Sequence, residues 1–177
     1  MIELIVLDVD GTLTDGKITY SNSGEETKSF DVADGLAIAV WTKKFGKKAA
    51  IITGRSSFVV EKRAKELNIT HLHQGIKNKQ EVLEQILKEE NLSWSQVAAI
   101  GDALNDYNML KKVGLSFTPA NGTHYLKEFV NVVCQNRGGE GAVREMLEYI
   151  FKETLILVGM TLLFMGLSIK NYKTRLE

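Results

Sequence analysis

The stretch LIVLDVDGTLTDGKI (residues 4–18) decides the fold. Its first residues are leucine, isoleucine and valine, a run that is typical of a buried strand. Asp8 and Asp10 follow this run directly, and Asp15 comes soon after. A buried carboxylate is strongly destabilising unless cations or hydrogen bonds compensate it. The stretch therefore predicts a buried strand that carries acidic side chains to a site able to compensate them.

The rest of the chain alternates between strand and helix patterns. Strands are expected within residues 47–55, 97–106, 114–120 and 130–136, and helices within residues 34–46, 56–68 and 78–91. Asp34 is expected to open the first helix and Asn78 to cap the third. Strand and helix in alternation predict an α/β fold, a doubly wound, Rossmann-like parallel sheet.

Residues 17–30 (KITYSNSGEETKSF) interrupt this alternation. Two short alternating runs flank a Ser-Asn-Ser-Gly turn, which predicts a β-hairpin inserted into the fold. This hairpin and one helix use the interval between Asp8 and Thr53, so no separate cap domain is expected there.

Composition excludes several classes of protein. Among 177 residues, 22 are Lys or Arg and 22 are Asp or Glu, so the net charge is zero and gives no reason to expect nucleic-acid binding. The single cysteine, Cys134, is expected to be buried rather than bonded or catalytic. No signal peptide is recognised at the N-terminus, and a cytoplasmic enzyme is expected. Trp41 and Trp94 are expected in the core or an interface.

Polar side chains gather where the predicted strands end, which is where doubly wound sheets bind ligands. The residues are Asp8, Asp10, Thr53, Gly54, Arg55, Asp102 and Asp106, with Lys79 at the start of a helix. Clustered carboxylates favour a hard divalent cation such as Mg²⁺. The cations and the hydroxyl would then face an anionic, oxygen-rich substrate, as in phosphoryl transfer.

These residues resemble the four motifs of the haloacid dehalogenase-like phosphatases: DVDGT, ITGR, a lysine at a helix start and GDALND. The resemblance implies that Asp8 is the nucleophile that forms an aspartyl-phosphate and that Asp10 is the general acid and base. It implies that Thr53 and Lys79 hold the phosphoryl oxygens. Mg²⁺ would bind Asp8, the backbone carbonyl of Asp10 and Asp102, with Asp106 supporting this shell.

A closer resemblance covers residues 1–152. The segments 8–18, 24–38, 52–67 and 137–146 are similar to the 3-deoxy-D-manno-octulosonate (KDO) 8-phosphate phosphatases, capless homotetramers that serve lipopolysaccharide assembly. In that family the hairpin closes a neighbour's active site. The resemblance places Gly54, Arg55, Arg63, Gly138, Gly139 and Arg144 near the sugar acid.

Two departures from the family pattern and three alternatives remain open at this point. Ala33 replaces a frequent arginine, and Ala103 replaces a frequent aspartate. A phosphatase of nonulosonate 9-phosphates uses nearly the same motifs. A phospho-accepting receiver domain also combines acidic residues, threonine and lysine, but it lacks an acid two residues after its acceptor. A non-catalytic sugar-acid binding module is the third alternative.

The C-terminal segment, residues 153–177, is expected to be a separate apolar tail. Residues 154–169 contain no charged side chain. As a helix they would span about 24 Å, which is less than a hydrocarbon core of about 30 Å. Three interpretations of the tail remain: a helix packed in the oligomer, a marginal membrane anchor, or an extension outside the family pattern with no catalytic role.

Overall fold

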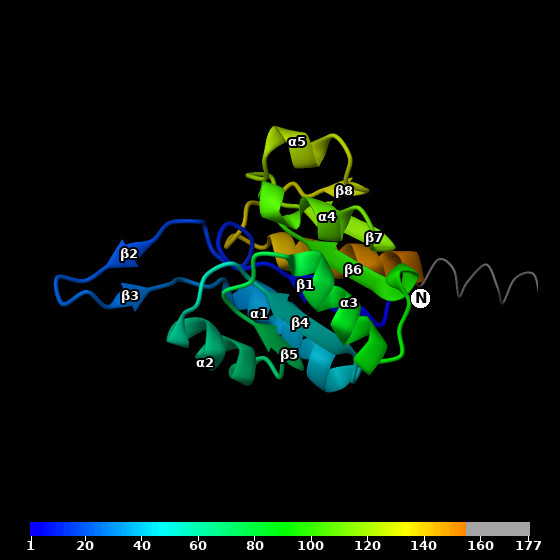
Figure 1. The fold of residues 1–177 in the computed structure, drawn as a ribbon, viewed down its shortest axis with the longest axis horizontal. Helices are drawn as coiled ribbons and strands as arrows, with labels where there is room; N and C mark the ends of the chain where they lie inside the picture. Colours follow the sequence, from blue (N-terminus) through cyan, green and yellow to red (C-terminus); the bar gives the residue numbers. More distant parts are fainter. Residues whose placement is uncertain (155–177) are drawn as a thin grey trace, which may run out of the picture. The chain divides into compact units, whose positions relative to one another are not determined.

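The apolar run that opens the chain forms β1 (Leu4–Leu7), whose side chains are completely buried. In the computed structural model, which describes residues 1–154, β1 pairs with β4 (Lys48–Ile52) and β6 (Val97–Ile100). The full sheet has the order β5-β4-β1-β6-β7-β8 (Figure 1). The other strands are β5 (His71–His73), β7 (Leu115–Thr118) and β8 (Val132–Val133). Every pair is parallel, which confirms the predicted α/β fold.

Helices lie between the strands in chain order. They are α1 (Val32–Ala39), which continues as the π-helical turn η1 (Val40–Lys44), α2 (Phe58–Glu66), α3 (Lys79–Glu89), α4 (Tyr107–Leu110) and α5 (His124–Lys127). Two 3₁₀ turns precede β6 and α4: η2 (Trp94–Gln96) and η3 (Leu104–Asp106). A further helix begins at residue 142 and is described to residue 154. Residues 1–147 form one compact unit, and residues 148–177 are assigned to a second.

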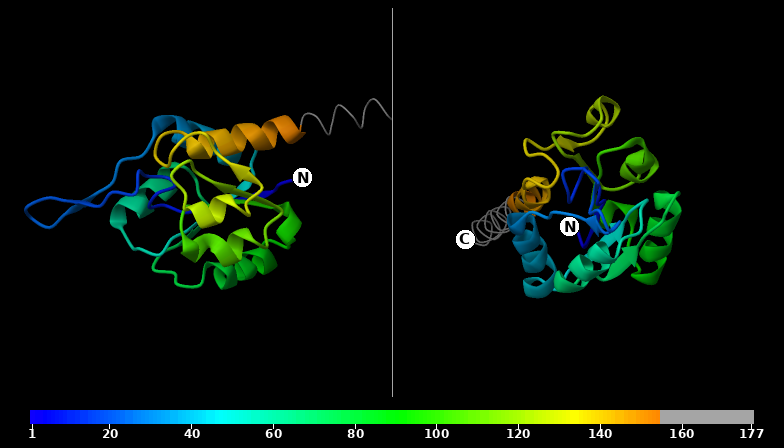
Figure 2. Two further views of the ribbon diagram at one scale, coloured as in Figure 1. Left: turned by 90° about the horizontal axis from the view of Figure 1, so that it is seen from above. Right: turned by 90° about the vertical axis from the view of Figure 1, so that its left-hand side faces the viewer.

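The side chains on the two faces of β1 pack against different helices. Leu4 and Val6 belong to a hydrophobic core that includes Leu83 of α3 and Met109 of α4. Ile5 and Leu7 alternate with them along the strand and point to the opposite face. Figure 2 shows α1 on that opposite face, so helices cover the sheet on both sides.

The strand order creates a topological switch point between β1 and β6. From β1 the chain steps outward to β4 and β5, and it then returns to β6 and steps outward the other way to β7 and β8. In open α/β sheets, ligands bind in the crevice at the carboxyl ends of the strands beside such a point. Asp8 and Asp102 follow the two strands that meet there.

The predicted hairpin is confirmed, with antiparallel strands β2 (Thr19–Tyr20) and β3 (Glu26–Thr27). It projects away from the sheet, as Figures 1 and 2 show. Residues 21–25 at its tip are exposed. Between β1 and β4 the chain forms only this hairpin, α1 and η1.

One predicted helix start is wrong, and a second is right in position but lacks the expected capping bond. Helix α1 begins before Asp34, because the side chain of Asp31 accepts hydrogen bonds from the backbone N–H of Ala33 and Asp34 and so caps the helix. Asp34 is instead buried within α1, where its Oδ1 accepts a 2.7 Å hydrogen bond from the backbone N–H of Arg144. Asn78 occupies the N-cap position of α3, but its side chain makes no capping hydrogen bond.

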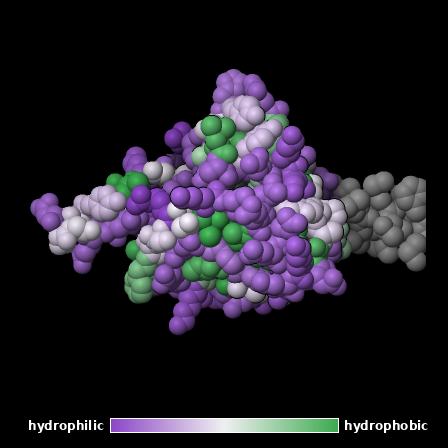
Figure 3. All heavy atoms as spheres, in the orientation of Figure 1, coloured by the Kyte–Doolittle hydropathy of each residue, from purple (hydrophilic) through white to green (hydrophobic). Residues whose placement is uncertain are grey.

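Burial elsewhere follows the sequence expectations. Trp41 and Cys134 are buried, as predicted. Hydrophilic side chains cover most of the face in Figure 3. No helix within residues 1–154 is long and apolar enough to cross a membrane. The predicted apolar tail lies outside the described residues from residue 155 onward.

Candidate active site

The register of the central strands brings the sequence-predicted acids to one edge of the sheet. Leu7 lies opposite Ile51 of β4 and Ile100 of β6, so the residues after these three emerge next to one another. The backbone N–H of Asp8 donates to the carbonyl of Ile100 over 3.2 Å, which extends this pairing into the site. Thr53, just past β4, is also buried at this edge.

Asp8, Asp102 and Asp106 form a cluster that could hold a metal ion. One carboxylate oxygen from each lies within 4.8 Å of the others. Thr12 orients Asp102, since its hydroxyl donates to Asp102 Oδ1 over 3.3 Å. Gly11 is required beside this carboxylate, because it has a φ of +96° and a Cβ there would lie 2.2 Å from Asp102 Oδ2.

Lys79 contacts two of the three acids and is buried. Its ammonium group is 2.7 Å from Asp8 Oδ1 and 2.6 Å from Asp106 Oδ1. Burial works to lower the pKa of Lys79, but the charges and hydrogen bonds of the two carboxylates outweigh it and raise that pKa. Lys79 is therefore a fixed cation at the base of the site.

One ammonium does not balance three carboxylates. Burial, together with the charges of Asp8 and Asp106, raises the pKa of Asp102 to about 7. Burial and the charge of Asp8 raise the pKa of Asp106 to about 6. Burial is the larger cause of both shifts and repulsion between the carboxylates adds to it, and a bound divalent cation would favour the charged form of both acids. A donor set made only of carboxylate oxygens fits a hard cation such as Mg²⁺.

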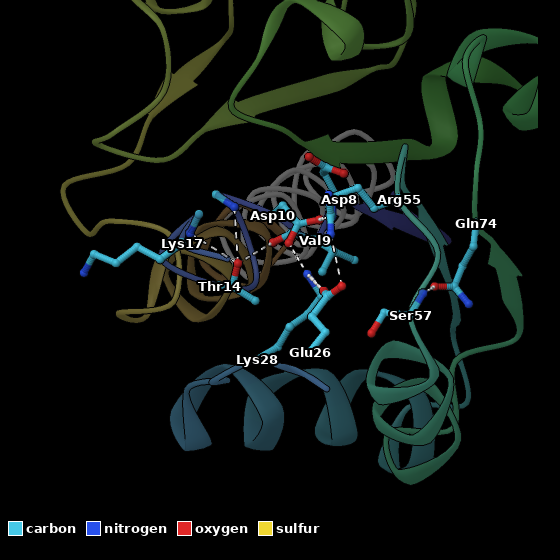
Figure 4. A network of polar contacts seen from close by, with 12 residues as sticks. Asp8, Val9, Asp10, Thr14, Lys17, Glu26, Lys28, Arg55, Ser57 and Gln74 are labelled. Carbon is cyan, nitrogen blue, oxygen red and sulfur yellow. Dashed lines mark hydrogen bonds and ion pairs between the residues drawn. The ribbon is translucent and has the colours of Figure 1, made fainter. Parts of the chain in front are cut away.

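The side chain of Asp10 lies in a second cluster, at the base of the hairpin (Figure 4). Its Oδ1 pairs with the ammonium of Lys28, which also lies 2.8 Å from Glu26 Oε1. Arg55 Nε is 3.8 Å from Asp10 Oδ2, and Arg55 Nη2 is 3.0 Å from Glu26 Oε2. The cations of Lys28 and Arg55 thus alternate with the carboxylates of Asp10 and Glu26.

Thr53 and Gly54 form the loop between β4 and α2. The backbone N–H of Thr53 donates to the carbonyl of His73 over 3.0 Å, and its carbonyl accepts from the backbone N–H of Ile76 over 3.0 Å. These bonds hold Thr53 in place at the sheet edge. A Cβ at Gly54 would lie 3.7 Å from Asn105 Nδ2, an ordinary contact, so nothing in the packing requires glycine there.

Gly138 and Gly139 pack against the loop that follows β1. A Cβ at Gly138 would lie only 1.9 Å from the carbonyl oxygen of Gly11, so the two backbones need this glycine to approach. Asn121 joins the same two loops: it donates to the Gly11 carbonyl over 2.8 Å and accepts from the Gly138 N–H over 2.6 Å. Gly139 donates to the carbonyl of Thr12 over 3.1 Å.

The remaining predicted substrate residues contact other elements. Arg63 donates to the carbonyl of Asp31 over 3.3 Å and lies over the ring of Phe30, with its Cζ 5.5 Å from the ring centroid. The side chain of Arg144 is exposed, and its backbone N–H binds Asp34. Both arginines therefore lie around the start of α1, beside the end of the hairpin.

Sequence reasoning missed Lys28, Thr12 and Asn121. The pairing of Lys28 with Glu26 could have been predicted, because the two residues are two apart in an extended strand and lie on the same side of it. The role of Asn121 could not, since it depends on two loops that meet only in the folded chain.

This fold and this site together define a haloacid dehalogenase-like hydrolase, and the sequence model of that family matches residues 72–147. The 3-deoxy-D-manno-octulosonate 8-phosphate phosphatase of Escherichia coli K12 is 41% identical over 150 residues, 84% of this chain and 79% of that protein. Its counterpart from Yersinia pestis is 40% identical over 168 residues, 95% of this chain and 87% of that protein. The chain belongs to this family of phosphatases and is a phosphoric monoester hydrolase.

Solved structures agree with this assignment. The phosphatase of Moraxella catarrhalis, in complex with magnesium, phosphate and KDO, superposes with a TM-score of 0.82 at 40% identity and covers 89% of this chain and 92% of its own. The cobalt-bound phosphatase of Haemophilus influenzae has a TM-score of 0.80 at 34% identity and covers 85% of this chain and 88% of its own.

Proposed function

We propose that this protein hydrolyses 3-deoxy-D-manno-octulosonate 8-phosphate to KDO and phosphate, as a step of lipopolysaccharide assembly. The observation that carries the proposal is the cluster of Asp8, Asp102 and Asp106 at the switch point of the sheet, in which buried Lys79 contacts Asp8 and Asp106. The relatives that share about two fifths of the sequence are phosphatases of this sugar acid.

Magnesium is the proposed cofactor. The side chains of Asp8 and Asp102 and the backbone carbonyl of Asp10 are the proposed ligands, with Asp106 as support. The Moraxella relative contains magnesium, and the all-oxygen cluster of this chain suits the same ion. When bound, Mg²⁺ would neutralise charge on the phosphoryl oxygens. Asp106 is already engaged, since its Oδ1 binds Lys79 and its Oδ2 accepts from the backbone N–H of Ala103 over 3.1 Å.

In the proposed reaction Asp8 attacks phosphorus, so that a bond forms between its carboxylate oxygen and phosphorus while the bond to the sugar oxygen breaks. Asp10 gives a proton to the leaving sugar oxygen. Asp10 then takes a proton from water, which attacks the aspartyl-phosphate and releases phosphate and free Asp8. Lys79 and the hydroxyl of Thr53 are proposed to bind the phosphoryl oxygens.

The sugar acid is proposed to lie near Gly54, Arg55, Gly138 and Gly139, with Arg63 and Arg144 nearby. The departure at Ala103 is compatible with the site, because this residue acts through its backbone N–H. Ala33 lines a hollow of about 740 Å³ with Phe30, Gly139 and other residues, where a shorter side chain leaves more room.

The relatives favour the octulosonate phosphatase over the nonulosonate 9-phosphate phosphatase. Membership of a phosphatase family also argues against a receiver domain and a non-catalytic binding module.

A homotetramer in the cytoplasm is part of the proposal. Val32 and Leu36 are exposed by 83% and 67%, and both line the same hollow beside the end of the hairpin. Exposed apolar side chains around a hollow suit an interface with a second copy. The balanced composition and single cysteine suit the cytoplasm. A membrane contact would involve the tail beyond residue 154.

The proposal is tested by phosphate release from KDO 8-phosphate. The purified enzyme is treated with EDTA, dialysed and assayed before and after Mg²⁺ is added back. We expect turnover only with the metal. Activity that is unaffected by EDTA would contradict the magnesium site, and no release of phosphate would contradict the substrate.

A further inference from the structure

Lys28 is a buried cation of the hairpin to which the reaction described above gives no role. Its side chain is 1% exposed, whereas that of Arg55 in the same cluster is 40% exposed. Figure 4 shows the Lys28 ammonium between the carboxyl groups of Asp10 and Glu26. Burying an ammonium is costly, and the two carboxylates compensate that cost.

The surrounding contacts tie the base of the hairpin to the loop after β1. Glu26 forms ion pairs with Lys28 through Oε1 and with Arg55 through Oε2. Arg55 also donates to the hydroxyl of Tyr20 over 3.2 Å. Both hairpin strands therefore reach the same cluster. Within it, Lys28 makes the closest contact to Asp10, while Arg55 Nε stays 3.8 Å from the other oxygen.

This arrangement leaves the two oxygens of Asp10 unequal. Oδ1 accepts a charge-assisted hydrogen bond from Lys28, which restrains the orientation of the carboxyl group. Oδ2 has no contact at hydrogen-bond distance to Arg55 and can exchange a proton with a reacting oxygen. A proton donor accelerates a reaction only when it is held in the right geometry.

We propose that Lys28 is a positioning residue, which holds Asp10 so that its free oxygen delivers a proton to the leaving sugar oxygen. This inference rests on the proposed function, in which Asp10 is the general acid. It makes the hairpin part of the chemical machinery of its own subunit. Loss of a positioning residue should slow the hydrolysis of substrates with poor leaving groups, which need a proton, more than that of substrates with good ones. Loss of a purely structural lysine should slow both equally.

The test compares kcat/KM for alkyl phosphates, including KDO 8-phosphate, with kcat/KM for p-nitrophenyl phosphate, whose leaving group departs without protonation. We expect Lys28→Met to lower kcat/KM about 100-fold on the alkyl phosphates and less than about 5-fold on p-nitrophenyl phosphate. Lys28→Arg, which keeps the cation, should recover about 10-fold or more on the alkyl phosphates. In an Asp10→Asn background, Lys28→Met should cost less than about 3-fold.

Lys17→Met is the matched control, because Lys17 is on the same hairpin, is 82% exposed and pairs only with Asp15 among the described ion pairs. It should behave as wild type on both kinds of substrate. Thermal unfolding midpoints of all variants identify any that fail to fold. Equal losses on alkyl and aryl phosphates, no loss at all, or a full loss in the Asp10→Asn background would overturn the role of Lys28.

The two proposals fail in different ways. A wild-type enzyme that hydrolyses other alkyl phosphates but not KDO 8-phosphate would contradict the substrate and leave the Lys28 comparison intact. A wild-type enzyme without phosphatase activity on any of these compounds would overturn both.

Discussion

Asp8 and Asp10 are two residues apart, yet they have different neighbours. Asp8 lies with Lys79, Asp102 and Asp106, and Asp10 lies with Lys28 at the base of the hairpin. The separation suits two tasks, because a nucleophile needs a free oxygen toward phosphorus while an acid must face the leaving group. The first prediction follows from it.

We expect Asp8→Asn to abolish turnover, because the amide cannot form the aspartyl-phosphate. Asp10→Asn should retain Asp8 as the nucleophile and lower the rate about 10²–10⁴-fold, and it should allow the phosphorylated enzyme to accumulate. Rapid acid quench followed by mass spectrometry detects the added phosphoryl group. Turnover of Asp8→Asn near the wild-type rate would contradict the covalent route.

Asp34 gives a second prediction, on stability. Burial raises its pKa from 3.8 to about 6, against the opposing hydrogen bond from the backbone of Arg144. The folded protein therefore keeps this proton at pH values where the unfolded chain has lost it. The contribution of Asp34 to stability is greatest below about pH 4, falls as the pH rises through about 6, and is constant above.

The loss amounts to about 3 kcal/mol at most. Urea unfolding of wild type and Asp34→Asn, in EDTA from pH 4 to pH 8, measures it. Asp102 and Asp106 contribute equally to both proteins and cancel in the difference. The wild type should lose stability more steeply than the variant between pH 4 and pH 6.5, and parallel curves would show that Asp34 titrates normally.

Residue identities in the site were predictable from sequence, but their partners were only partly so. The segments DVDGT and GDALND predict acidic residues at strand ends, and the parallel pairing of β1 with β6 brings Asp8 and Asp102 together. The contact between Asp106 and Lys79 was not predictable, because it depends on how α3 enters the edge of the sheet. The contact of Lys28 with Asp10 depends on the fold-back of the hairpin.

Among the elements, the strands and the hairpin were predicted more accurately than the helix starts. Periodicity locates a buried strand, whereas a helix start depends on which of two nearby acids accepts the capping hydrogen bonds. Residues 31–34 contain two aspartates, and the chain uses Asp31. Asp34 therefore lies inside the helix and accepts a hydrogen bond from the backbone N–H of Arg144. No local sequence pattern predicts this contact.

The hairpin gives the third prediction. Its tip, residues 21–25, is exposed, while its base contacts Asp10 of the same chain. If the hairpin closes a neighbour's active site, as the family resemblance implies, removal of residues 22–25 should lower kcat/KM on KDO 8-phosphate by about 10-fold or more, because water then enters that site. The unfolding midpoint should change little. Full activity of a monomeric form, identified by light scattering, would contradict the shared site.

At the scale of the whole molecule, residues 1–147 form one compact unit that contains the proposed catalytic residues and metal ligands. We expect truncation after Lys152 to leave kcat within a few-fold of the full chain and to increase solubility or shift the enzyme from membrane to soluble fractions. Activity assays and fractionation of both forms measure this. Loss of both activity and assembly would instead make the tail part of the functional oligomer.

The most direct test of the central claim is kcat/KM for KDO 8-phosphate beside a nonulosonate 9-phosphate, measured with Mg²⁺ for wild type and for Asp8→Asn. We expect wild type to prefer the octulosonate by about 10-fold or more and Asp8→Asn to hydrolyse neither compound. A preference for the nonulosonate would contradict the proposed substrate, and residual turnover by Asp8→Asn near the wild-type level would contradict the proposed site.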